Sequence, residues 1–299
     1  MTDNEYLKKT LAAQTLAADS DELKALRAHR ADVEALLRDK FAESTPTIRY
    51  GGSKAKGTVI KEAYDLDVIC YFAHDDDKAG QNLKEIYDNV RAALQTKYNV
   101  IQKPTALRLH GCDVSKPDFH IDVVPGRFTD DEKDDAFLYR ASGEKNRQKT
   151  NLRKHVEHVK DSGVLDAIRL MKLWRCRNGL TVRHFILELL TIQLLKEKAN
   201  NPLTDQLQGV WTELRDNIDD LSVEDPANPT GNDLSELFDS TVKRELQVAA
   251  RDTLADIEEH GWESVYGPIE EPSEAAKREA LQKAPAIMTG TAKPWLPEQ

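Results

Sequence analysis

Tyr64–Phe72, with the sequence YDLDVICYF, is the stretch that decides the fold of this chain. Its β-branched and aromatic residues alternate in a way that is typical of a β-strand. A period of two places Asp65 and Asp67 on one face of the strand, and Leu66 and Val68 on the other. Two carboxylates at positions i and i+2 therefore reach the same side, where they can bracket a metal ion.

A short glycine-rich turn precedes this strand. Thr47–Tyr50 is predicted to be a strand that leads into Gly51, Gly52 and Ser53. Glycines let backbone N–H groups approach a phosphate, and a serine hydroxyl adds another donor. Gly52 and Ser53 are therefore candidate phosphate-binding residues, although a Gly-Gly-Ser sequence alone is usually only a turn.

A third carboxylate lies in an apolar stretch. Phe119–Val124 alternates like the first strand and points Asp122 away from Ile121. An acid in such a strand is costly to bury unless it is paired or bound to a metal. Two divalent ions held by carboxylates can position a triphosphate and neutralise its charge, and magnesium prefers oxygen ligands. Together with Asp65 and Asp67, Asp122 predicts a site for two Mg²⁺ or Mn²⁺ ions, with one acid able to activate an attacking hydroxyl.

The rest of the chain predicts an α+β protein. Amphipathic spacing predicts a helix from about Ser20 to Phe41, with Asp21 as its N-cap, and another over residues 80–96. Extended segments are expected near residues 98–101 and 106–110. Beyond Pro125 the strand pattern ends, and helices are predicted near residues 145–160, 164–177, 184–199, 203–221 and 234–260. We therefore expect a catalytic domain over residues 1–144, a helical lobe over 145–271 and a polar tail over 272–299.

The charge of the chain limits what it can bind. It has 52 acidic and 42 basic residues, whereas a surface that grips a nucleic-acid polymer needs a basic face. A local basic pocket for one triphosphate is compatible with this charge. No apolar run approaches the roughly 20 residues of a membrane-spanning helix, and the N-terminus lacks the pattern of a secretory signal. We expect a cytoplasmic protein that binds neither a nucleic-acid polymer nor a membrane.

The turn and the three acids resemble the polymerase-β-like nucleotidyltransferases, whose signature is Gly-Ser, then Asp-x-Asp, then a lone Asp on a neighbouring strand. Here these are Gly52-Ser53, Asp65-Leu66-Asp67 and Asp122 in HIDVVPG. In the second half, AIRLMKLWR and HFILELLTIQLL look like the paired helices of the oligoadenylate synthetase and cyclic GMP-AMP synthase-like branch. EDPANPTGNDLS, residues 224–235, looks like the Asp-Pro and Asn loop of that branch. The chain is most similar to the bacterial CD-NTases, which make cyclic di- and trinucleotides in anti-phage signalling.

This resemblance implies a polymerase-β-like core sheet with a C-terminal helical lobe. It also implies that Asp65 and Asp67 hold both metal ions, that Asp122 helps to activate the acceptor hydroxyl, and that Lys172 reaches the triphosphate. The family often carries a Ser-aromatic pair at the head of the next helix, with the hydroxyl on phosphate and the ring on a base. This chain has His184 and Phe185 there, so a histidine replaces the hydroxyl.

Two of these side chains also have a plain structural interpretation. Without the resemblance, Lys172 would be a solvated lysine on an amphipathic helix, and Phe185 could be a core residue. His155 and His158 are expected to be solvated. Arg108, Arg127 and Arg183 could contact bases or phosphate or lie on the surface, and the sequence does not separate these roles.

The implied activity is condensation of nucleoside triphosphates, such as ATP and GTP, into a cyclic oligonucleotide with release of pyrophosphate, under the control of a regulatory protein partner in some cases. One alternative is a template-independent transferase acting on RNA 3′ ends or on a protein, which would want a basic track or a further recognition domain. Another is a nucleotide sensor without catalysis, which would be expected to have lost one of the acids.

Overall fold

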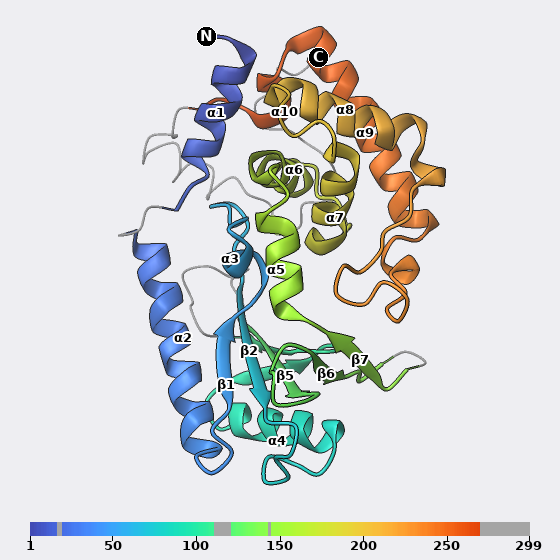
Figure 1. Ribbon diagram of the computed structural model, residues 1–299. Coiled ribbons are helices and arrows are strands. Elements are labelled where there is room, and N and C mark those ends of the chain that lie inside the picture. Colours follow the sequence, from blue (N-terminus) through green and yellow to red (C-terminus); the bar gives the residue numbers. More distant parts are fainter. Residues whose placement is uncertain (17–19, 111–120, 143–144, 270–299) are drawn as a thin grey trace.

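The computed structural model describes residues 1–16, 20–110, 121–142 and 145–269. It has the expected α+β architecture, with a helical lobe stacked above a lobe that holds the sheet (Figure 1). The described strands are β1 (Thr47–Tyr50), β2 (Leu66–Phe72), β3 (Asn99–Gln102), β4 (Leu107–His110), β5 (Ile121–Phe128), β6 (Ala136–Tyr139) and β7 (Arg147–Thr150).

The described helices fall into two groups. Beside the sheet lie α2 (Asp21–Lys40), α3 (Gly52–Lys56) and α4 (Leu83–Gln95) (Figure 1). The helical lobe contains α1 (Asp3–Ala13), α5 (Leu152–Lys160), α6 (Leu165–Arg177), α7 (His184–Leu195), α8 (Leu203–Asp216), α9 (Ser240–His260) and α10 (Glu263–Tyr266).

The strand order is β1-β2-β5-β4-β3, and β6 pairs with both β5 and β7. β2 and β5 are parallel, whereas β4 is antiparallel to β5. Leu66, Val68 and Ile121 point to the face that packs against α2 and α4. The residues that alternate with them, including Asp67 and Asp122, therefore point to the other face, on the side of α3.

Two predictions after Pro125 were wrong. β5 continues through Pro125 to Phe128, because Pro125 falls between the pairing with β4, which reaches Val123, and the pairing with β6, which starts at Arg127. The missing N–H of Pro125 therefore removes no hydrogen bond from the pairing of β5 with β4 or β6. Residues 147–150 form β7 rather than helix, because the polar sequence RQKT pairs with β6. The sheet thus extends beyond residue 144.

Helix boundaries also differ from those predicted. Ser20, not Asp21, is the N-cap of α2, and its side chain accepts a hydrogen bond from Leu23 N. The helix expected from residue 234 begins at Ser240, where the Asp239 side chain caps it. The helix α1 was not predicted at all. It packs into the helical lobe, where Tyr6 donates a 2.6 Å hydrogen bond to Gly267 O.

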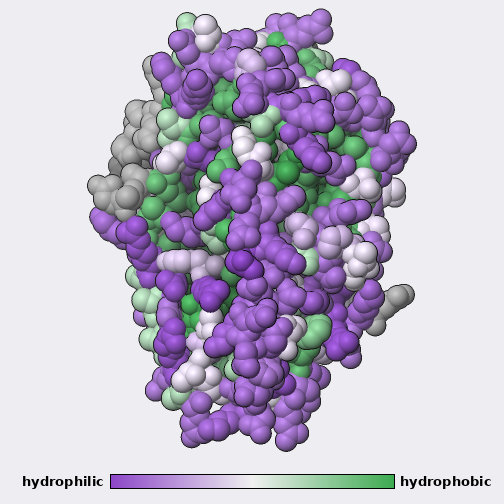
Figure 2. Space-filling view, viewed as in Figure 1, coloured by the Kyte–Doolittle hydropathy of each residue, from purple (hydrophilic) through white to green (hydrophobic). Residues whose placement is uncertain are grey.

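Hydrophilic side chains cover most of the face seen in Figure 2. Within the described ranges, no helix combines the length and the apolar character needed to cross a membrane. The predicted polar tail over residues 272–299 lies outside the described residues.

Candidate active site

The three predicted aspartates meet on one face of the sheet. The parallel register of β2 and β5 makes Asp67 the direct neighbour of Asp122, and Asp65 comes immediately before β2. All three side chains are partly exposed. Neighbouring strands lie about 4.8 Å apart, so two carboxylates opposite each other can bind the same metal ion. The structure therefore brings an all-oxygen set of donors to one place, which suits magnesium or manganese.

The glycine-rich turn lies directly against Asp67. Gly52 has a φ of +49°, and a Cβ atom added there would lie 1.6 Å from Asp67 Oδ2. Gly51 N donates a 2.9 Å hydrogen bond to Asp67 O. Ser53 follows in the first turn of α3 and is partly exposed. The absence of a side chain at Gly52 thus lets the turn approach the Asp67 carboxylate.

Gly52→Ala is expected to lower turnover by about a hundredfold or more, because a misplacement of about 1 Å at reacting groups has effects of this size. The new methyl group must displace either the Asp67 carboxylate or the turn. Steady-state turnover, together with the melting temperature, measures the effect.

Gly57→Ala is the matched control. Gly57 also has a positive φ, +78°, but a Cβ atom there would meet nothing within 4 Å. This variant should lose about 1 kcal/mol of stability from backbone strain and keep its turnover within a few-fold of the original. Equal losses of turnover in the two variants would show that strain, not contact with Asp67, matters.

Arg108 holds the third aspartate. On β4 it is the register partner of Asp122, and its Nε and Nη2 donate to the two carboxylate oxygens at 2.8 and 2.7 Å. The hydrogen bond to Asp122 raises the pKa of Arg108, with Asp65 and Asp67 adding to the effect. Across the described residues, no three His, Cys, Asp or Glu side chains are arranged to hold a metal ion. Asp122 would have to leave Arg108 to join such a site.

Lys172 is buried rather than solvated. Its side chain is only 2% exposed, and its Nζ donates to Thr58 O at 2.8 Å. Nζ also lies 3.8 Å from Glu188 Oε1. Glu188 accepts from Lys56 Nζ and from Thr58 Oγ1, both at 2.7 Å. This buried cluster of Lys56, Thr58, Lys172 and Glu188 joins α3 to α6 and α7. Burial lowers the pKa of Lys172.

His184 and Phe185 begin α7 beside this cluster. Arg175 Nη1 lies 2.8 Å from His184 Nε2. Burial, with Lys172 and Arg175, lowers the pKa of His184 to about 3. Phe185 is partly buried, and its ring lies 4.9 Å from Lys56 Nζ and 5.1 Å from the ring of His155. Phe185 thus contacts both the helical core and the helix that carries the turn.

His155 is not solvated, contrary to expectation. Its Nε2 lies 2.7 Å from Asp225 Oδ1, and Asp225 is buried. Asn232 Nδ2 donates to Asp225 Oδ2 at 2.7 Å and to Lys149 O at 2.8 Å. The Asp-Pro and Asn loop singled out in the sequence is therefore fixed to α5 and to β7.

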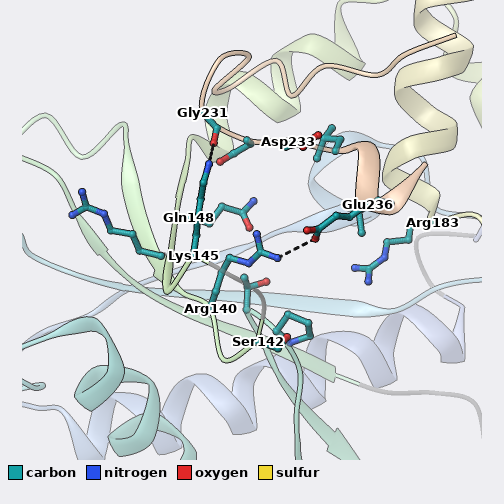
Figure 3. A pocket seen from close by; sticks show the side chains of 14 residues that line it. Arg140, Ser142, Lys145, Gln148, Arg183, Gly231, Asp233 and Glu236 are labelled. Atoms are coloured by element: carbon teal, nitrogen blue, oxygen red, sulfur yellow. Dashed lines mark hydrogen bonds and ion pairs between the residues drawn. The ribbon is translucent and has the colours of Figure 1, made fainter. Parts of the chain in front are cut away.

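A basic pocket of about 490 Å³ lies between this loop and the sheet. Figure 3 shows Arg140 and Lys145 entering it from below and Arg183 from the helical lobe. Arg140 pairs with Glu236 at 3.7 Å, and Lys145 donates to Gly231 O at 3.3 Å. Among the described residues, the charged side chains that line the pocket are four basic and two acidic ones: Arg140, Lys145, Arg147, Arg183, Asp233 and Glu236. It can hold a nucleotide-sized anion.

The structure gives different contacts to the three arginines whose roles the sequence left open. Arg108 binds Asp122, and Arg183 lines the pocket. Arg127 donates to the backbone oxygens of Asp76, Gly80 and Gln81, so it supports the loop after β2.

Sequence reasoning missed Glu188 and Arg175. Glu188 had a usable signal, because it is the one acid in the apolar stretch HFILELLTIQLL, as Asp122 is in its strand. Arg175 had none, since nothing in its local sequence distinguishes it from a surface arginine.

Comparisons with known proteins agree on the fold. No family model and no curated protein matches the sequence. CdnC from Escherichia coli MS115-1, solved with ATP, superposes with a TM-score of 0.64 at 19% identity, covering 91% of this chain and 99% of CdnC. CdnC has also been solved in a complex with HORMA-deltaN.

Two further structures give the same result. The CD-NTase CdnG from Bradyrhizobium diazoefficiens, in complex with GTP, has a TM-score of 0.68 at 14% identity, covering 94% of this chain and 98% of CdnG. The cyclic AMP-GMP synthase DncV from Vibrio cholerae has a TM-score of 0.59 at 17% identity, covering 91% and 86%. This chain therefore has the fold of the bacterial CD-NTases, a polymerase-β-like core sheet with a helical lobe.

Proposed function

We propose that this chain is a metal-dependent nucleotidyltransferase that condenses nucleoside triphosphates into a cyclic oligonucleotide and releases pyrophosphate. The observation that carries the proposal is the pairing of Asp67 with Asp122 across two parallel strands, with the Gly52 turn against Asp67. The fold supports it, because the similar CdnC and CdnG were solved with ATP and GTP.

Each residue of the site has a role in this proposal. Asp65 and Asp67 would hold two Mg²⁺ or Mn²⁺ ions, which supply charge neutralisation for the triphosphate. The backbone at Gly52 and the Ser53 hydroxyl would donate hydrogen bonds to its phosphates. Asp122 would accept the proton of the attacking hydroxyl, and this requires its carboxylate to leave Arg108.

The helical lobe would complete the substrate site. To reach the triphosphate, Lys172 would give up its hydrogen bond to Thr58 O and donate to a phosphate oxygen instead. Its ammonium would move within the cluster that contains Glu188. The Phe185 ring would stack on a base. The basic pocket would take the remainder of a nucleotide, with Arg140 and Arg183 as donors.

The setting of the reaction follows from the same resemblance. We place the enzyme in the cytoplasm and in anti-phage defence, with nucleoside triphosphates as substrates and no nucleic-acid polymer bound. A regulatory protein partner is part of the proposal, since the similar CdnC forms a complex with HORMA-deltaN.

Product analysis tests this function. Purified protein is incubated with magnesium and with ATP, GTP, CTP and UTP labelled on the α-phosphate, and the products are treated with phosphatase. We expect small products that keep the label of every α-phosphate, because a ring has no terminal phosphate, whereas a linear product loses the label at its 5′ end. Chelation with EDTA should abolish them, and added Mg²⁺ or Mn²⁺ should restore them. Label that is linear or bound to a macromolecule would instead support the transferase alternative, and no incorporation would support a sensor.

A further inference from the structure

The contact between Arg175 and His184 determines which ring nitrogen of the imidazole carries the proton. Arg175 Nη1 lies 2.8 Å from His184 Nε2. A guanidinium has only hydrogen-bond donors and keeps its charge. His184 Nε2 must therefore be the acceptor, which leaves the single proton of a neutral imidazole on Nδ1. Within the described part of the chain, nothing accepts a hydrogen bond from this Nδ1.

The surroundings of His184 disfavour a second proton. The charged groups near it are Lys172 and Arg175 on α6, Glu188 on α7, and Asp65 before β2. The two cations and burial outweigh the two carboxylates. His184 is also the first residue of α7, where the positive end of the helix dipole opposes a cation. The side chain is therefore a neutral donor throughout the physiological range of pH.

Arg175 is itself well anchored. It lies near the C-terminal end of α6, and its Nε donates to Val182 O, two residues before His184. One guanidinium therefore binds both the segment that enters α7 and the first side chain of that helix. Its planar fork can fix the orientation of the imidazole ring as well as its proton.

We propose that Arg175 is a positioning residue that fixes His184 as a neutral Nδ1–H donor to a phosphate of the nucleoside triphosphate. The inference rests on the proposed function and specifies how this chain binds the triphosphate where a hydroxyl is absent. The start of α7 is suitably placed, because Phe185 contacts Lys56 of α3, the helix that carries the Gly52 turn. A neutral imidazole also adds no positive charge near Asp65. A positive charge there would compete with bound metal ions.

The first test reads the proton directly and requires no turnover. The full chain is labelled with ¹⁵N-histidine, and the His184 signal is assigned by its loss in His184→Asn among the eight histidines. We expect a protonated Nδ1 and a bare Nε2 that stay unchanged from about pH 5 to pH 8. In Arg175→Met, the tautomer should no longer be fixed, and the imidazole should titrate at a higher pH. A wild-type signal with its proton on Nε2, or one that titrates like the exposed histidines, would overturn the inference.

The second test measures binding of non-hydrolysable analogues of ATP, GTP, CTP and UTP by calorimetry, and the variants are compared on an analogue that the wild type binds. His184→Asn keeps an N–H donor close to the position of Nδ1, so it should bind within a few-fold of the wild type. His184→Gln places its amide near Nε2 instead, and His184→Ala has no donor. Both should bind about ten- to hundredfold more weakly, the range expected for a lost hydrogen bond to a charged group. Melting temperatures identify any variant whose fold is damaged.

The outcomes separate this inference from the proposed function. If the wild type binds the analogues and His184→Ala binds equally well, the phosphate role of His184 is wrong while the proposed function stands. If the wild type binds none of the four analogues, both proposals fail. If binding follows the order wild type, Asn, then Gln and Ala, and the proton lies on Nδ1, the inference is supported.

Discussion

Replacing Asp67 with Asn is expected to lower turnover by about three orders of magnitude or more, while the protein stays folded. The change keeps the shape of the side chain but removes the negative charge that would hold the metal ions. It also removes the negative charge next to Asp122, because residue 67 on β2 is the register partner of Asp122 on β5. Turnover is measured from phosphatase-resistant product at saturating magnesium, and folding from the melting temperature.

Asp75→Asn is the matched control for this prediction. Asp75 follows the other end of the same strand, and its side chain is 75% exposed. Its replacement removes the same charge at a distance from the site and should leave turnover within about twofold, because exposed charges are strongly screened. Near wild-type turnover in Asp67→Asn would contradict the assignment of the metal site.

Replacing Glu188 with Gln is expected to destabilise the fold by about 3–5 kcal/mol, the range for a buried ion pair that loses one partner. Gln keeps the volume, but it leaves Lys56 and Lys172 buried without their carboxylate. Chemical denaturation measures the loss. Adding Lys56→Met to this variant should recover part of the stability, because it removes one of the two uncompensated charges.

Glu34→Gln is the matched control for Glu188. Glu34 is also a helical glutamate between two cations, Arg30 and Arg38, but it lies on the surface of α2. Its replacement should cost less than about 1 kcal/mol, since exposed ion pairs contribute little. Equal losses at the two positions would show that the buried cluster has no special role.

The same cluster predicts a pH dependence. Burial raises the pKa of Glu188, but Lys56 and Lys172, together with hydrogen bonds from Lys56 and Thr58, lower it below its ordinary value. A folded pKa below the unfolded one means that the contribution is complete above the ordinary glutamate pKa and is lost as the pH falls below it. Glu188→Gln should therefore lose less stability than the wild type as the pH falls below about 4.5.

The sequence was sufficient to predict the strands that carry Asp67 and Asp122, because the period of two in YDLDVICYF and FHIDVV assigns each aspartate to one face of the sheet. It could not supply the partner of Asp122. Arg108 becomes that partner only through the antiparallel register of β4 and β5. β7 was missed because its polar sequence has no strand pattern and is extended only by pairing with β6.

The interior of the helical lobe was the less predictable part of the site. An acid in the apolar segment of α7 signals a buried partner, but Lys56 lies 132 residues earlier in the chain. The resemblance assigned Lys172 to phosphate, and its amphipathic helix suggested a solvated lysine. The structure contradicts the solvated interpretation, because the ammonium is buried against Thr58 O. Such contacts depend on how two lobes pack, and local periodicity carries no information about that.

In the proposed function, Asp65, Asp67 and Asp122 together hold two metal ions at the triphosphate. The most direct measurement is anomalous diffraction from crystals grown with Mn²⁺ and a non-hydrolysable nucleoside triphosphate. We predict two manganese peaks between the triphosphate and Asp65 and Asp67, with Asp122 released from Arg108 and turned toward them. Manganese bound elsewhere, or a triphosphate bound away from the Gly52 turn, would contradict the account.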